Sequence, residues 1–199
     1  MKVDRQQLLN DIGITKPENE LRVGEWVSIS QNKKLTEEFI RNFNVNLCWR
    51  SICRHQTLSE SFIEEFQNEV YWITISQFQT LSEDFIRNHQ NDVGWGNISN
   101  EQKLSEEFIE EFQDKVYWRG ISSFQTLSER FLIDFKNKID WDIYFYYQQG
   151  SFSIIKKFIT KTNYLNINEL NHSTLNDAQK SEINKMLELK YSFINQKAN

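Results

Sequence analysis

A 23-residue period runs through most of the chain. All six tryptophans lie 23 residues apart, and five leucines follow the same spacing. These residues are Trp26, Trp49, Trp72, Trp95, Trp118 and Trp141, and Leu35, Leu58, Leu81, Leu104 and Leu127. Such a period is typical of arrays in which each repeat is a small supersecondary unit that buries its apolar face against its neighbours. A repeat protein is therefore expected.

Counting places from each leucine gives five full repeats, at residues 35–57, 58–80, 81–103, 104–126 and 127–149. A degenerate copy before them keeps Trp26 and Ile29. A degenerate copy after them keeps apolar residues at places 5, 6, 9, 15 and 18, which are Ile154, Ile155, Phe158, Tyr164 and Ile167. Stacked arrays use atypical end copies as caps. We therefore divide the chain into an N-terminal cap (1–34), the five repeats (35–149) and a C-terminal cap (150–199).

The apolar residues of a repeat fall at places 1, 5, 6, 9 and 13, which is the stripe of an amphipathic helix rather than the alternation of a strand. Place 2 holds Ser, or Thr in the first repeat, and either residue can cap a helix N-terminus. Acidic residues follow in the first turn, where they suit the helix dipole. We predict a first helix at places 2–13 and a shorter second helix at places 15–21. Gln at place 22 is expected to satisfy free carbonyl groups at the end of the second helix.

These helical hairpins predict an all-α fold, an α-solenoid, because one hairpin cannot bury its own aromatic residues but stacked neighbours can. The chain has only one Pro and six Gly, which disfavours an all-β fold with many tight turns. Near the C-terminus, Leu175, Ile183 and Leu187 fall near one helical face. We predict one longer helix there, with Thr174 and Asp177 as a capping box, that closes the apolar end of the array. Caps at both ends predict a monomer.

The consensus L-S-E-E-F-I-x-x-F-x-x-x-V-x-W-x-x-I-S-x-x-Q resembles short repeats found in proteins of giant DNA viruses, some phages and some bacteria, most of which have no assigned function. The resemblance covers about residues 21–149. It implies helical repeats and no particular chemistry. Two residues depart from the pattern, namely His89 at a Phe place and Tyr144 at an Ile place.

The sequence offers no convincing catalytic or cofactor site. Cys48, Cys53 and His55 are the best metal-ligand candidates, but their spacing is not that of a common zinc motif. Cys53 stands where other repeats have Ser, so we expect a small, semi-buried residue there. His89 is expected to be a packed or edge-exposed ring, and His172 to be part of a turn. We therefore predict a non-enzymatic protein with no cofactor and no small-molecule substrate.

The charge distribution argues against direct nucleic-acid binding by the repeats. Residues 35–149 hold ten Lys and Arg against nineteen Asp and Glu, a net charge of −9, whereas the C-terminal cap carries +3. An acidic array would repel phosphates. The alternative is a nucleic-acid-associated protein that uses the basic C-terminal segment. No apolar run reaches the length of a signal peptide or a membrane span, so we expect a cytoplasmic protein, in the host cytoplasm if it is viral.

Two surfaces are left as candidates for binding a protein partner. The first is the acidic ridge, whose residues are Glu60, Glu64, Glu65, Glu69, Glu83, Asp84, Glu106, Glu107, Glu110, Glu111 and Asp114. The second, here called the second-helix surface, consists of Tyr71, Ile73, Phe78, Tyr117, Arg119, Phe124 and Tyr146. The same variable places, 14, 16, 17, 20 and 21, also hold Arg50, Arg54, His55, Ile143 and Tyr147. Aromatic and Arg residues are typical of binding hot spots. The alternatives are a solvated outer face for the ridge, and packing between repeats for Phe78, Phe124 and Tyr147.

The sequence thus predicts a protein-binding repeat module that acts through the second-helix surface or through the acidic ridge. Regularly spaced carboxylates, including Glu64, Glu65, Glu110 and Glu111, can attract a basic surface or imitate a phosphate backbone. The resemblance to viral and phage repeats implies a narrower form of this function, an inhibitor that occupies a host factor or a defence complex.

Overall fold

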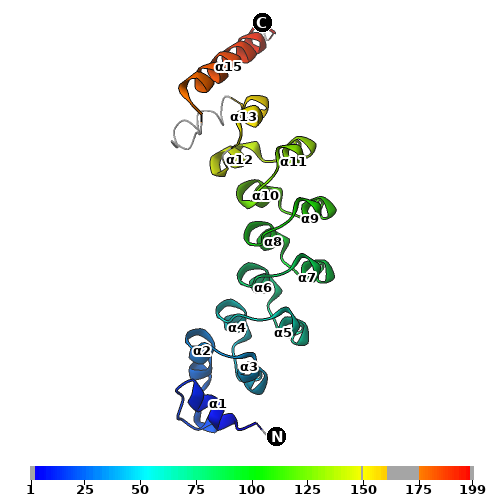
Figure 1. Cartoon of the computed structure of the whole chain (residues 1–199). Helices are drawn as coiled ribbons and strands as arrows, with labels where there is room; N and C mark the ends of the chain where they lie inside the picture. Colours follow the sequence, from blue (N-terminus) through cyan, green and yellow to red (C-terminus); the bar gives the residue numbers. More distant parts are fainter. Residues whose placement is uncertain (1–2, 149, 161–174, 198–199) are drawn as a thin grey trace. The chain divides into compact units, whose positions relative to one another are not determined.

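The computed structural model describes residues 3–148, 150–160 and 175–197. Throughout this part of the chain the regular elements are helices, fourteen α-helices and one short 3-10 helix, with no strand. This confirms the all-α, solenoid-like prediction. The chain divides into two compact units, residues 1–102 and 103–199, and each is described by itself. The elements of both can be followed by label in Figure 1.

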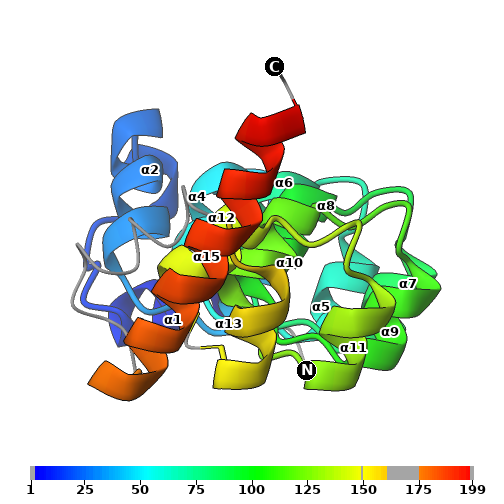
Figure 2. The same cartoon turned by 90° about the horizontal axis from the view of Figure 1, so that it is seen from above.

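The N-terminal unit begins with α1 (Arg5–Asp11), η1 (Glu18–Glu20) and α2 (Val23–Asn32), and then alternates the two helices of each repeat. The first helices are α3 (Glu37–Phe43), α5 (Glu60–Glu65) and α7 (Glu83–Asn88). The second helices are α4 (Trp49–His55), α6 (Trp72–Phe78) and α8 (Trp95–Glu101). In this unit the first helices form one layer and the second helices another, as Figures 1 and 2 both show.

The C-terminal unit continues the same pattern. Its first helices are α9 (Glu106–Glu111) and α11 (Glu129–Asp134), and its second helices are α10 (Trp118–Phe124) and α12 (Trp141–Tyr147). The degenerate copy supplies α13 (Phe152–Phe158), at places 3–9. The long helix α15 (Asp177–Lys197) places Ile183 and Leu187 in one buried cluster with Ile154 and Ile155. This confirms a longer helix that covers the last repeat.

The cap of α15 differs from the predicted one. Asn176 accepts a hydrogen bond from the backbone N–H of Gln179, and the Gln179 side chain accepts one from the backbone N–H of Asn176, each at 2.9 Å. This is a reciprocal capping box two residues after the predicted position. The predictions for four residues, Tyr164, Ile167, His172 and Thr174, fall outside the described residues.

The place-2 residues cap the first helices, as predicted. The hydroxyl oxygen of Ser59 accepts a hydrogen bond from the Phe62 N–H at 3.2 Å, and the same bond recurs in the other repeats. The capping residues are Thr36, Ser59, Ser82, Ser105 and Ser128. Each capping side chain accepts a hydrogen bond from one N–H group of the first turn that has no partner within the helix.

The first helix is shorter than predicted. It ends at place 8 in repeats 2 to 5 and at place 9 in repeat 1, and places 10–13 form turns. The tryptophan at place 15 stabilises these turns, because the Trp72 indole N–H donates to the Gln67 carbonyl at 3.2 Å and Trp141 donates to Lys136 at 2.9 Å. Val70, at place 13, is buried although it is outside the helix. The apolar pattern at places 1, 5, 6, 9 and 13 therefore extends beyond the end of the first helix. The second helix spans places 15–21, as predicted.

Aromatic rings join consecutive repeats. The ring of Trp49 lies 5.0 Å from that of Phe66 in the next repeat, and Trp118 lies 5.5 Å from Phe135. His89 occupies the same place, buried, with its ring 4.6 Å from that of Trp72. His89 is therefore a packed ring, one of the two predicted possibilities. Tyr144, the other departure from the consensus, is buried as well.

A ladder of buried glutamines links the second helices. The Gln79 side-chain amide donates to the carbonyl oxygens of Cys53 and Gln56 in the preceding repeat, at 2.9 and 2.8 Å. Its own oxygen accepts from the Leu58 N–H at 2.9 Å. Gln56 makes the equivalent three bonds with Ser30, Lys33 and Leu35. This confirms the predicted role for place 22 and adds an acceptor role toward place 1.

The residue at place 19 forms a second link. Ser76 donates to the Trp72 carbonyl at 2.7 Å and accepts from the Gly94 N–H of the next repeat at 2.9 Å. Cys53 takes this place in the first repeat, where its sulfur accepts from the Tyr71 N–H at 3.4 Å. Cys53 is fully buried, so it replaces the serine as a small structural residue.

The two thiols are expected to react at different rates. Burial raises the pKa of Cys53, whereas the hydroxyl hydrogen bond from Ser51 lowers the pKa of the half-buried Cys48. Because the thiolate is the nucleophile, native protein should react with iodoacetamide quickly at Cys48 and slowly at Cys53. Mass spectrometry of timed samples would measure this. The variant Cys48→Ser should lose the fast phase, and a fast phase that persists in it would contradict the assignment.

Candidate functional site

The second-helix surface is exposed in both units. The exposed fractions are 51% for Tyr71, 67% for Ile73, 40% for Phe78, 49% for Tyr117, 55% for Phe124 and 45% for Tyr146. Arg119 is exposed as well. These residues stand at places 14, 16, 20 and 21, whereas the isoleucine at place 18 of the same helices is completely buried in α6, α8 and α10. Each second helix therefore has one face in the core and one face that presents large apolar side chains to solvent.

Side chains at place 21 also touch their neighbours along the stack. The Arg54 guanidinium lies 4.7 Å from the centre of the Phe78 ring, and the rings of Phe124 and Tyr147 are 5.7 Å apart. Tyr146 and Tyr147 pack edge to face at 4.7 Å. Both alternatives for these residues thus hold in part, because they contact adjacent repeats and still expose 40% or more of their area. Such contacts restrict the motion of these rings.

More carboxylates of the acidic ridge form hydrogen bonds within the protein than the sequence indicates. The place-3 glutamate of one repeat binds the capping residue of the next, as Glu37 accepts from the Ser59 N–H at 2.8 Å and Glu60 accepts from the Ser82 hydroxyl at 3.1 Å. Glu106 binds Ser128 in the same way in the C-terminal unit. These carboxylates therefore connect consecutive first helices.

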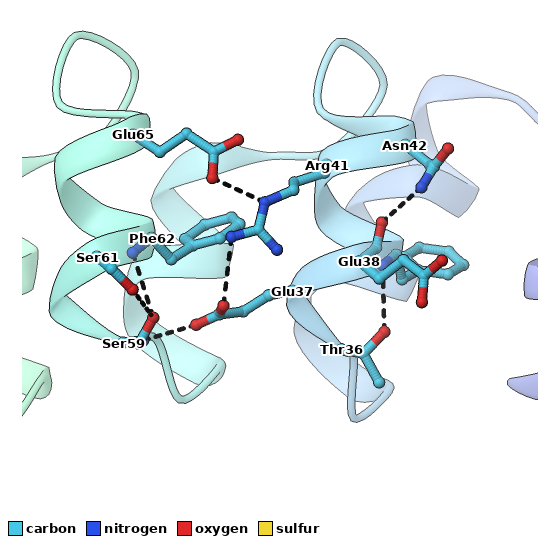
Figure 3. Close-up of polar contacts among 10 residues, drawn as sticks. Thr36, Glu37, Glu38, Arg41, Asn42, Ser59, Ser61, Phe62 and Glu65 are labelled. Atoms are coloured by element: carbon cyan, nitrogen blue, oxygen red, sulfur yellow. Dashed lines mark hydrogen bonds and ion pairs between the residues drawn. The ribbon is translucent and has the colours of Figure 1, made fainter. Parts of the chain in front are cut away.

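Further ridge carboxylates pair with side chains of adjacent repeats. Arg41 donates to Glu65 at 2.7 Å and also lies beside Glu37, as Figure 3 shows. Glu64 lies 2.6 Å from Nε2 of His89, and Lys138 lies 3.2 Å from Asp114. The ridge of the N-terminal unit is thus partly neutralised from within. Glu64 and Glu65, two of the predicted site residues, belong to this network.

The ridge is more open in the C-terminal unit. A groove of about 450 Å³ lies between α9 and α11, and its lining includes Glu106, Glu107, Glu110, Arg130 and Asp134. Within the described residues, Glu107 and Glu110 form no ion pair. Glu111, the remaining predicted residue, is exposed on the same helix. An acidic groove of this kind can accept a basic side chain.

Protonation of the inter-repeat carboxylates is expected to weaken the stack. Partial burial alone would raise the pKa of Glu37, but hydrogen bonds from Ser59 and attraction to Arg41 outweigh it and hold the pKa below its ordinary value of 4.5. A lowered folded-state pKa contributes stability that is present above 4.5 and is lost as the pH falls through the folded value. Urea unfolding at stepwise lower pH should therefore show a loss that is smaller in Glu37→Gln. An equal pH dependence in both proteins would contradict it.

Two further groups of candidates are the possible metal ligands and the basic C-terminal segment. Among the described residues, no group of three or more His, Cys, Asp or Glu side chains could hold a metal ion. In the basic C-terminal segment, Lys156 pairs with Glu182 at 2.5 Å, and Lys157 lies over the Phe158 ring. Within the same described part of the chain, no helix combines the length and the apolar character needed to cross a membrane.

Sequence reasoning missed the inter-repeat role of the place-3 glutamates, which it attributed to the helix dipole alone. It also treated Arg54 as one of several variable residues, although Arg54 contacts Phe78 directly. A signal for the glutamates was available. A carboxylate recurs 22 residues before each Ser cap, from Glu37 and Ser59 onward.

Comparison of the chain with protein-family models, with curated proteins and with solved structures gives no match.

Proposed function

We propose that this protein is a non-enzymatic binding module that captures another protein through the second-helix surface. The observation that carries the proposal is the exposure of Tyr71, Ile73 and Phe78 in one unit and of Tyr117 and Phe124 in the other. Large apolar side chains that the core does not need, held on rigid helices, are the residue types that dominate binding energy at protein interfaces. The repeats supply the scaffold, and the variable places supply recognition.

A binding experiment tests this proposal. Simultaneous Tyr71→Ala, Phe78→Ala, Tyr117→Ala and Phe124→Ala substitutions should abolish capture of partners from the native cell, while the circular dichroism spectrum stays that of a folded helical protein. A matched control carries four alanines at exposed residues away from both candidate surfaces, at Glu38, Asn68, Asn88 and Asn137. Capture that survives the four aromatic substitutions would refute the second-helix surface.

The acidic groove between α9 and α11 is a second candidate, because Glu107 and Glu110 face it without an ion pair among the described residues. A basic partner would bind there with an affinity that falls as salt rises. Glu107→Lys with Glu110→Lys should weaken such a partner and leave a partner of the second-helix surface unaffected. Binding that responds to neither salt nor these reversals would exclude charge mimicry.

The resemblance to viral and phage repeats supports a narrower version, in which the captured protein is a host factor or part of a defence complex and is inhibited because its surface is occupied. An activity assay of the captured partner, with and without this protein, separates inhibition from simple binding.

A further inference from the structure

The two helix layers of the N-terminal unit carry opposite charge characters. The first helices α3, α5 and α7 hold seven carboxylates and two arginines. The second helices α4, α6 and α8 hold Arg50, Arg54 and a single carboxylate, Glu101, together with His55. An acidic layer therefore backs a layer that is neutral to basic. A charged partner would be steered to one layer and repelled from the other.

Among the described residues, the arginines of the second-helix layer form no ion pair. In the described residues, Arg41 of the first-helix layer pairs with Glu65, whereas Arg50 and Arg54 pair with no carboxylate. Arg54 instead lies over the Phe78 ring at 4.7 Å. A guanidinium that stacks on a ring still has a fork of N–H donors to offer a carboxylate. Both arginines are exposed.

An apolar patch adjoins these arginines. Ile73 and Phe78 lie on α6, the helix next to α4, and Tyr71 is the N-cap residue that precedes α6. On the other side of α6, the places that match Tyr71 and Ile73 are Gly94 and Gly96. A Cβ at Gly94 would lie 3.7 Å from the Ile73 Cα, so the side chain that the other repeats carry at this place is missing beside Ile73, which is 67% exposed. The result is an arginine pair beside an uncovered aromatic and aliphatic patch.

We propose that this face, formed by Arg50, Arg54, Tyr71, Ile73 and Phe78, binds an acidic segment of a partner protein that also carries an aromatic or aliphatic side chain. The inference rests on the proposed function and specifies its partner. Carboxylates of the partner would pair with Arg50 and Arg54, and its apolar side chain would cover Ile73 and Phe78. Single-stranded nucleic acid also combines negative charge with flat rings. A nucleic-acid strand carries a continuous line of phosphates, which the seven carboxylates of the first-helix layer would repel. Two arginines are enough to pair with a few carboxylates of a protein partner, so a protein segment is favoured.

The test is selection of a random peptide library, displayed on phage, against the full-length protein. Enriched peptides should combine Asp or Glu with Trp, Phe or Leu. A synthetic peptide of the enriched sequence should bind about tenfold or more weakly to the Arg50→Glu, Arg54→Glu variant. It should weaken similarly with the Ile73→Ser, Phe78→Ser variant. The control Lys34→Glu, Lys136→Glu makes the same charge change on exposed residues elsewhere and should keep the affinity within about twofold.

The outcomes separate this inference from the proposed function. If the apolar substitutions abolish binding and the arginine reversals do not, protein binding by this surface stands and the acidic partner is refuted. If neither variant changes the affinity, both are refuted. Labelled oligo-dT is titrated in parallel. Binding of the oligonucleotide that is lost in the arginine variant, without enrichment of acidic peptides, would assign the face to nucleic acid and overturn the proposal.

Discussion

Replacement of Gln79 by leucine is expected to lower the free energy of unfolding by about 3–5 kcal/mol, because three buried backbone groups lose their partner at once. The carbonyl oxygens of Cys53 and Gln56 lose a donor, and the Leu58 N–H loses its acceptor. Gln79 is buried, so water cannot replace these bonds without opening the stack. The cost is therefore that of unsatisfied groups and not only that of lost bonds.

Two further variants distinguish hydrogen bonding from packing. Gln79→Glu keeps the side-chain volume but presents an oxygen to two carbonyls, so it should destabilise at least as much as Gln79→Leu. Gln77→Leu makes the same change on the same helix at an exposed position and should cost no more than about 0.5 kcal/mol. Urea unfolding followed by circular dichroism gives the free energies, and amide exchange at Leu58 reports the lost acceptor. Equal stabilities of Gln79→Leu and Gln77→Leu would show that the ladder contributes nothing.

The repeat pattern was enough to predict what a single repeat does. The serine caps, the second helix at places 15–21, and the role of Gln at place 22 all follow from local rules for helix ends. The length of the first helix did not follow. Val70 is buried at place 13 like a helical residue, although the chain has already turned after Phe66. Apolar periodicity records burial, and in this repeat burial continues into the turn that Trp72 stabilises.

The interactions between repeats could not be predicted in the same way. The constant 22-residue spacing relates Glu37 to Ser59, but the bond between them also needs the distance between consecutive first helices, which the spacing does not supply. The same holds for the candidate surface. Place 21 carries Phe78 and Phe124, and phenylalanine is equally common in a core. Their exposure depends on how neighbouring repeats stack, which the residue type does not indicate. The chemistry of the surface was therefore visible in the sequence, but its exposure was not.

A comparison of two phenylalanines separates the scaffold from the binding surface. Phe62→Ala is expected to destabilise the protein by about 3–5 kcal/mol, because Phe62 is completely buried and packs against Phe66 and Trp49. Phe78→Ala removes the same ring from a position that is 40% exposed. It loses the contact with Arg54 and the burial of about half of the ring, for which about 1–2 kcal/mol together is expected.

The midpoints of urea unfolding measure both effects, and binding of a captured partner is measured on the same two variants. Phe78→Ala should weaken binding while the protein remains clearly more stable than the Phe62→Ala variant. Phe62→Ala should weaken binding only to the extent that the protein unfolds, and lowering the temperature or adding an osmolyte should restore it. If Phe78→Ala proves as destabilising as Phe62→Ala, place 21 belongs to the core of the stack. The assignment of the second-helix surface as a binding surface would then fail, because it depends on side chains that are not needed for the stability of the fold.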